Sequence, residues 1–181
     1  PHDESVLLGP LTSMTTRQNY TLDFSMRWEN RLPSTTWQYG YLVFGREHDG
    51  PFGIASKFRG EATDGCYVLT LRPGGRVRDE NGKYLSGDIA QVLRYDPAKR
   101  GKEPVVLHTM KLEKPLAANR NIDGKIIVKK DFFYYVINGQ YSPRLNDTAH
   151  RGPYVHFGRY HGNSNGGPLA LTRMVARESW A

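Results

Sequence analysis

The chain has 181 residues, a length that supports one good hydrophobic core but not two, so we expect a single domain over residues 1–181. Hydrophobic residues make up 38% of it beside 19 glycines and 11 prolines, which favours short strands and tight turns over helical bundles, and no apolar run approaches the length of a membrane-spanning helix. The net charge of +7 predicts attraction to a polyanion, but the scattered Lys and Arg residues carry no nucleic-acid-binding signature, which leaves an acidic polysaccharide as the expected partner.

The most regular pattern lies at residues 20–29. Aromatic and aliphatic side chains occupy every second position from Tyr20 to Trp28, and polar side chains, among them Arg27 and Glu29, occupy the positions between. Such alternation predicts a strand with one face in the core and the other turned to water or a ligand.

Two kinds of strand are expected next. Residues 37–48 are apolar on both sides for most of their length, which predicts a strand inside a sheet rather than at its edge. Residues 52–58 and 66–71 have the composition of further strands. We expect Pro73-Gly74-Gly75 to end the strand 66–71 in a turn.

The middle of the chain is dominated by turn residues. The pair Asn81-Gly82 predicts a hairpin, and residues 89–93 could supply one short helical turn. Residues 94–104 are polar, charged and interrupted by proline, which predicts a surface loop beside the sheet.

The last third again has the composition of strands, at residues 105–112, 124–130, 132–140, 154–161 and 169–177. The Asn138-Gly139 pair closes one of these strands. About ten strands at regular spacing predict an all-β fold, a two-sheet antiparallel β-sandwich or jelly roll, rather than a parallel α/β fold.

Cysteine and histidine usage argues against a disulfide or a metal site. The only cysteine, Cys66, cannot form an internal disulfide and is expected to be a small buried side chain. His156 and His161 are five residues apart in a predicted strand and so point to opposite faces, and we expect neither a metal nor a cofactor. A first residue other than Met suggests a processed chain, which is compatible with the secreted or periplasmic location that we expect.

Two stretches carry a resemblance to known proteins. Residues 125–140 resemble the late strand pair of concanavalin-like glucanase and lectin domains, which habitually ends in an Asn-Gly turn. Residues 154–162 resemble, more specifically, the Tyr-Phe-Lys-x-Gly-x-Tyr-x-Gln strand of jelly-roll polysaccharide lyases, the alginate lyases above all. Alternation places Tyr154, His156 and Tyr160 on one face of this strand, and Gly158 leaves a gap in which a sugar ring could lie. The resemblance implies a concanavalin-like jelly roll.

Two further stretches are similar to strands of the same lyases. Residues 44–52 resemble the lyases' Gln-x-His strand and its following turn, with Arg46 in place of the glutamine and His48 as the histidine. In the late motif His156 replaces the family's lysine and Gly162 replaces the final glutamine. Residues 27–31 have the form of the Arg-x-Glu-x-Arg strand, although further strands separate it from the histidine in alginate lyases.

The resemblance implies a β-eliminating lyase that acts on a uronate-containing polysaccharide. Arg46 or Arg27 would pair the sugar carboxylate, His48 would stabilise or accept the neighbouring proton, and Tyr160 would protonate the departing oxygen. The expected catalytic residues are therefore Arg46, His48 and Tyr160. The side chains expected to contact substrate are Arg27, Glu29, Trp37, Tyr154, His156 and Arg159.

The main alternative is a non-catalytic carbohydrate-binding or lectin-like module. In such a module Trp37, Tyr39, Tyr154 and Tyr160 stack on sugar rings, and arginines bind hydroxyls or carboxylates. A keto-disaccharide hydrolase or a viral attachment domain on the same fold is a third possibility. A retaining glucanase is disfavoured, because the sequence has no Glu-x-Asp-x-x-Glu cluster.

Overall fold

The computed structural model of the protein describes residues 3–10, 19–33, 38–50, 65–97, 104–160 and 166–178. This part of the chain contains no α-helix, and so none long and apolar enough to cross a membrane. The strands within it are β1 (Asp3–Pro10), β2 (Tyr20–Trp28), β3 (Tyr39–Gly45), β4 (Cys66–Arg78), β5 (Tyr84–Tyr95), β6 (Val105–Lys111), β7 (Ile122–Val128), β8 (Phe133–Ile137), β9 (Gln140–Tyr141), β10 (Gly152–Tyr160) and β11 (Leu169–Glu178).

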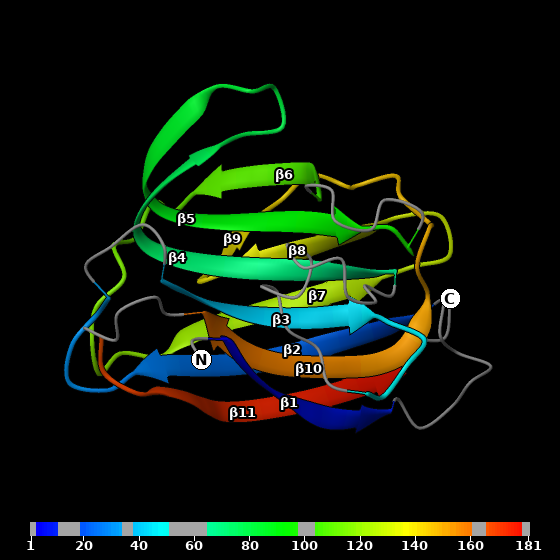
Figure 1. Ribbon diagram of the computed structural model, residues 1–181, viewed down its shortest axis with the longest axis horizontal. Coiled ribbons are helices and arrows are strands. Elements are labelled where there is room, and N and C mark those ends of the chain that lie inside the picture. The colour runs from blue at the N-terminus through cyan, green and yellow to red at the C-terminus, as the bar shows by residue number, and fades with distance from the viewer. Residues whose placement is uncertain are drawn as a thin grey trace.

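These strands form two stacked sheets in which all neighbours are antiparallel. One sheet has six strands in the order β1-β10-β3-β4-β5-β6, and the other has five in the order β11-β2-β7-β8-β9. Figure 1 shows the six-stranded sheet in front of the five-stranded one, with the strands of both running across the view. The predicted all-β, two-sheet antiparallel sandwich is confirmed.

The main core fills the space between the sheets. The alternating apolar residues of β2 all point into it, as the sequence predicts. β7 and β8 of the same sheet add to them, and β3, β4 and β5 contribute the facing side chains. Gly124 lies where the ring of Phe24 crosses β7, and a Cβ atom there would lie 2.2 Å from Phe24 Cζ. The glycine therefore permits an aromatic ring to lie directly on the sheet.

Several local predictions are confirmed, and two are wrong. Asn81-Gly82 lies in the turn of the β4–β5 hairpin, whose strands pair Arg78 with Tyr84, and β3 lies inside its sheet. Pro73-Gly74-Gly75 does not end a strand. Instead β4 continues to Arg78 through a bulge between Arg72 and Gly75, and the hairpin extends as an arm beyond the sheet (Figure 1).

Residues 89–93 belong to β5 rather than to a helical turn. They pair with β4 on one side and with β6 on the other, and the backbone hydrogen bonds to both strands outweigh any local preference for a helical turn. The predicted strand at residues 52–58 lies outside the described residues.

Candidate functional site

The six-stranded sheet has a second buried cluster on its outer face, which is the side turned away from the five-stranded sheet. The members of this cluster alternate along their strands with residues of the main core, so they point the other way. They are Tyr39, Tyr41, Val43, Cys66, Val68, Leu93 and Tyr95, with Tyr160 and Val106 packed against them. The prediction of a buried Cys66 is confirmed.

Strand β10 presents its late residues to this outer face. His156, Gly158 and Tyr160 pair with Val43, Tyr41 and Tyr39 of β3, which places all three on one face, as the alternation predicts. Tyr154 keeps this alternation, since Val155 and Phe157 face the main core, but the register shifts between Gly152 and His156 and Tyr154 forms a bridge with Arg46.

Arg46, directly after β3, and His156 of β10 form a buried polar pair. Arg46 is 3% exposed and His156 is 1% exposed, and Arg46 Nη1 lies 2.9 Å from His156 Nε2. A guanidinium can only donate, so Nε2 accepts and the imidazole of His156 is neutral with its proton on Nδ1. Arg46 Nη1 also donates to the carbonyl oxygen of Gly50 at 2.5 Å. This geometry ties the end of β3 to β10.

The opposite end of these strands carries an aromatic and basic group, which we call the Tyr160 site and define as Tyr39, Arg72 and Tyr160 of the outer face together with Arg159, which points to the other side of β10. The rings of Tyr39 and Tyr160 stack with centroids 5.4 Å apart and planes at 24°. The guanidinium of Arg72 lies 3.9 Å from the centroid of the Tyr39 ring. Burial lowers the pKa of the Arg72 guanidinium, and this effect outweighs the influence of Tyr39 and Tyr95, which raises the pKa.

A small hollow opens beside this stack. Its lining includes Tyr39, Arg159 and Tyr160 from the six-stranded sheet and Trp28 from the other sheet. Arg159 Nη1 donates to the carbonyl oxygen of Gly167, another residue of the lining, at 3.3 Å. Tyr160 and Arg159 therefore both border this hollow, although they point to opposite faces of β10.

The structure does not bring His48 and Tyr160 together as a catalytic pair. Tyr160 pairs with Tyr39 at the start of β3, whereas His48 is exposed beyond the end of that strand. The seven residue steps from Tyr39 to Arg46 alone span about 23 Å at roughly 3.3 Å per residue. Two groups that far apart cannot act on one sugar ring.

The substrate contacts predicted on β2 also lie elsewhere. Arg27 and Glu29 flank Trp28, whose side chain is in the core, so they belong to the outer side of the five-stranded sheet. Arg27 Nη2 donates to Glu29 Oε1 at 3.0 Å, which makes them an ion pair on a partly exposed face. Trp37 lies outside the described residues.

A charged network that no local sequence pattern indicates lies at the His48 end of the sandwich. It joins the start of β4, the end of β5 and the segment before β10. Tyr67 Oη donates to Asp147 Oδ1, Arg94 Nη1 lies 2.6 Å from Asp147 Oδ2, and His150 Nε2 lies 3.0 Å from Asp96 Oδ1. Arg94 Nε contacts both Asp96 oxygens at 3.1 Å.

The network sets the charge of its members. Desolvation acts to raise the pKa of Asp147, but hydrogen bonds from Tyr67, Arg94 and the Ala149 amide outweigh it and lower that pKa. The pKa of Asp96 is likewise lowered, because hydrogen bonds from His150 and Arg94 outweigh its desolvation. Burial and the bond to Asp147 raise the pKa of Tyr67, so its phenol stays protonated. These directions describe an ion-pair network that fastens the segment before β10.

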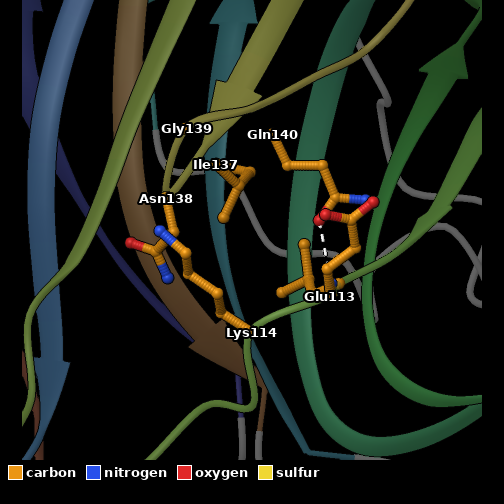
Figure 2. A pocket seen from close by; sticks show the side chains of 7 residues that line it. Glu113, Lys114, Ile137, Asn138, Gly139 and Gln140 are labelled. Carbon is orange, nitrogen blue, oxygen red and sulfur yellow. Dashed lines mark hydrogen bonds between the residues drawn. The ribbon is translucent and has the colours of Figure 1, made fainter.

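A pocket of about 120 Å³ lies at another end of the sandwich, between the segment after β6 and the β8–β9 turn (Figure 2). The amide of Gln140 is already engaged, since it accepts from the Glu113 N–H and donates to the Lys111 carbonyl. Asn138 Oδ1 accepts from the Asp123 N–H. These side chains hold the pocket wall together. Among the described residues no three His, Cys, Asp or Glu side chains are placed to hold a metal ion.

Comparison with known proteins shows similarity of structure only. No family model matches the sequence, and no curated protein matches it. The metal-free carbohydrate recognition domain of Emp46p superposes with a TM-score of 0.72 at 8% identity, over 99% of this chain and 79% of that one. The carbohydrate binding module CBM66 from Bacillus subtilis gives 0.58 at 12% identity, over 97% and 82%.

An enzyme is also among the similar structures. Alginate lyase A1-II′ superposes with a TM-score of 0.54 at 14% identity, over 91% of this chain and 63% of that one. Identities this low establish the shared fold and nothing more. The shared fold is a two-sheet antiparallel β-sandwich of the jelly-roll kind, as the resemblance of residues 125–140 and 154–162 implies.

Proposed function

We propose that the protein binds an acidic glycan chain, and that it does so at the Tyr160 site. The observation that carries this proposal is the Tyr160 ring, which is partly exposed, stacked on Tyr39 and bordered by a hollow that Arg159 lines. An aromatic face attracts the C–H groups of a sugar ring, and guanidinium groups bind carboxylates through paired hydrogen bonds. The net charge of +7 favours an anionic polymer over a neutral one.

The similar structures support a saccharide ligand for this chain. Two of those reported above carry names that describe carbohydrate binding or recognition, and the third is named a lyase of alginate. Binding without catalysis is the simpler proposal. His48 lies at the far end of β3 from Tyr160, and the one histidine among the described residues of β10, His156, is buried against Arg46.

β-Elimination of a uronate-containing glycan is the finer alternative. What supports it is the sequence motif of β10, whose tyrosine is partly exposed on the outer face. In that case Tyr160 would need its hydroxyl to protonate the leaving oxygen, whereas a stacking residue needs only its ring. The two proposals therefore differ in what they require of one atom.

The substitutions Tyr160→Ala and Tyr160→Phe separate these proposals. We expect Tyr160→Ala to weaken binding of alginate, glucuronan or heparin oligosaccharides about tenfold, since a stacked ring contributes roughly 0.5–1.5 kcal/mol beyond its buried area. Tyr160→Phe should bind like the parent chain. Isothermal titration calorimetry measures both, with thermal unfolding to confirm that each variant is folded.

The exposed Tyr84→Ala variant serves as the control, since Tyr84 lies on the β4–β5 arm. Equal affinity of Tyr160→Ala and the parent chain would contradict the proposed site. Ultraviolet absorbance of unsaturated products, present in the parent chain and lost in Tyr160→Phe, would instead establish the lyase.

A further inference from the structure

The outer face of the five-stranded sheet carries a row of three aromatic side chains that the Tyr160 site does not use. We call Phe132, Tyr134 and Tyr141 the aromatic row. Ring centroids are 6.4 Å apart for Phe132 and Tyr134, and 6.5 Å apart for Tyr134 and Tyr141. The angle between the ring planes is 18° in the first pair and 24° in the second. Tyr141 is 69% exposed.

The strand register explains why the rings form a row. Tyr134 points away from the core because its neighbours Phe133 and Tyr135 are core residues. Tyr141 of the short strand β9 pairs with Val136, the next residue of β8 on the same face. The row therefore follows β8 along the sheet edge, with Tyr141 exposed and with Phe132 and Tyr134 half-buried.

Basic side chains surround the row. The guanidinium of Arg144 lies 4.4 Å from the centroid of the Phe132 ring. Lys125 of β7 is exposed directly opposite Val136, and exposed Lys130 lies in the β7–β8 turn. Asp131 is the acidic residue of this turn. Asp23 and Asp123 lie beside Lys125 on this face, but Arg173 already pairs with Asp23 at 2.6 Å, so the balance of charge next to the rings stays positive and suits a ligand that is both flat and anionic.

We infer that the aromatic row is a second binding site for an acidic glycan, with Tyr134 and Tyr141 stacking on successive sugar rings and Arg144 and Lys125 pairing their carboxylate or sulfate groups. A row one ring wide fits an extended sugar polymer, whose flat faces repeat along one direction. The choice of an acidic glycan follows from the positive surroundings, and it rests on the proposed function only in the class of ligand.

The two sites lie on opposite sheets, so one polymer chain cannot stack on both without passing round the sandwich. A protein with a site on each face would bind two strands of the polymer or a single long strand with increased avidity. Short oligosaccharides remove this avidity and report each site separately.

The test is calorimetric titration with short alginate, glucuronan and heparin oligosaccharides. We expect two molecules bound per chain. The double variant Tyr134→Ala/Tyr141→Ala should bind one molecule, at the Tyr160 site, and Tyr160→Ala should bind one molecule, at the aromatic row. Arg144→Gln should weaken binding of acidic oligosaccharides at the aromatic row severalfold, while the weak binding of neutral cellohexaose there stays unchanged. Tyr84→Ala is the matched control, because it removes an exposed tyrosine elsewhere.

Outcomes of this experiment separate the two proposals. Loss of binding in the double variant alone, with Tyr160→Ala unaffected, supports the aromatic row and contradicts the Tyr160 site. A double variant that binds like the parent chain overturns the aromatic row. A double variant with unchanged glycan binding but a lower oligomeric mass by light scattering also overturns it, because the row would then be a contact between copies of this chain.

Discussion

Replacement of Asp147 by Ala is expected to lower the free energy of unfolding by about 2–3 kcal/mol, since it leaves a buried donor without an acceptor and a cation without its nearest anion. Asp147 accepts from the buried Tyr67 hydroxyl, from Arg94 at 2.6 Å and from the Ala149 amide at 3.2 Å. The carboxylate fastens the segment before β10 to the ends of β4 and β5. Urea denaturation followed by tryptophan fluorescence measures the change.

Asn146→Ala is the matched control for this prediction. Asn146 is exposed and adjacent in the same segment, so its removal should change the unfolding free energy by less than about 0.5 kcal/mol. Equal effects of the two substitutions would contradict the role given to the Asp147 carboxylate.

The Asp147 carboxylate also makes the loss of unfolding free energy in Asp147→Ala depend on pH, and the sign of this dependence follows from the pKa directions. The pKa values of Asp147 and Asp96 are lowered in the folded chain, so their contribution is fully present above the unfolded-state pKa of about 3.9. It is lost as pH falls through the folded-state values. The difference in unfolding free energy between the parent chain and Asp147→Ala should therefore stay constant from neutral pH to about pH 5 and become smaller below about pH 4.

Replacement of Arg46 by Ala is the second large expected effect. Arg46 is buried, contacts His156 at 2.9 Å and donates to the Gly50 carbonyl at 2.5 Å. Its removal leaves a cavity and deprives His156 Nε2 and the Gly50 carbonyl oxygen of their donor. We expect the free energy of unfolding to fall by about 3 kcal/mol. Thermal unfolding should show a lower Tm, and Arg46→Lys should recover part of it.

The exposed Arg76 of the β4–β5 arm provides the control for Arg46. Arg76→Ala removes the same side chain from a place where its guanidinium lies 4.4 Å from the ring centroid of exposed Tyr84, and its Tm should match the parent chain. If Arg46→Ala kept the parent Tm but lost glycan binding, Arg46 would belong to the binding site rather than to the framework.

Much of the fold is predictable because strand alternation is a local property. The period-two run of residues 20–28 and the turn pairs Asn81-Gly82 and Asn138-Gly139 specify β2 and two hairpins without knowledge of the rest. Strand β1 was not predicted. Its residues show no regular alternation, and it forms an edge strand by pairing with β10.

The candidate site was less predictable because it depends on register. Both His48 and Tyr160 lie near the ends of predicted strands, and only the pairing of Tyr160 with Tyr39 shows that those ends are opposite ones. The network of Asp147, Arg94 and Tyr67 joins residues 53 and 80 positions apart, which no local pattern reports. The secreted or periplasmic location stays a prediction.

The most direct test of the proposed function is a nuclear magnetic resonance titration of the isotopically labelled chain with a short glucuronan oligosaccharide. We predict that the largest amide shift changes fall at Tyr39, Arg72 and residues 158–160, with a second group at residues 132–141. Shift changes confined to the His48 end of the sandwich, or no changes at millimolar ligand, would contradict glycan binding at the Tyr160 site.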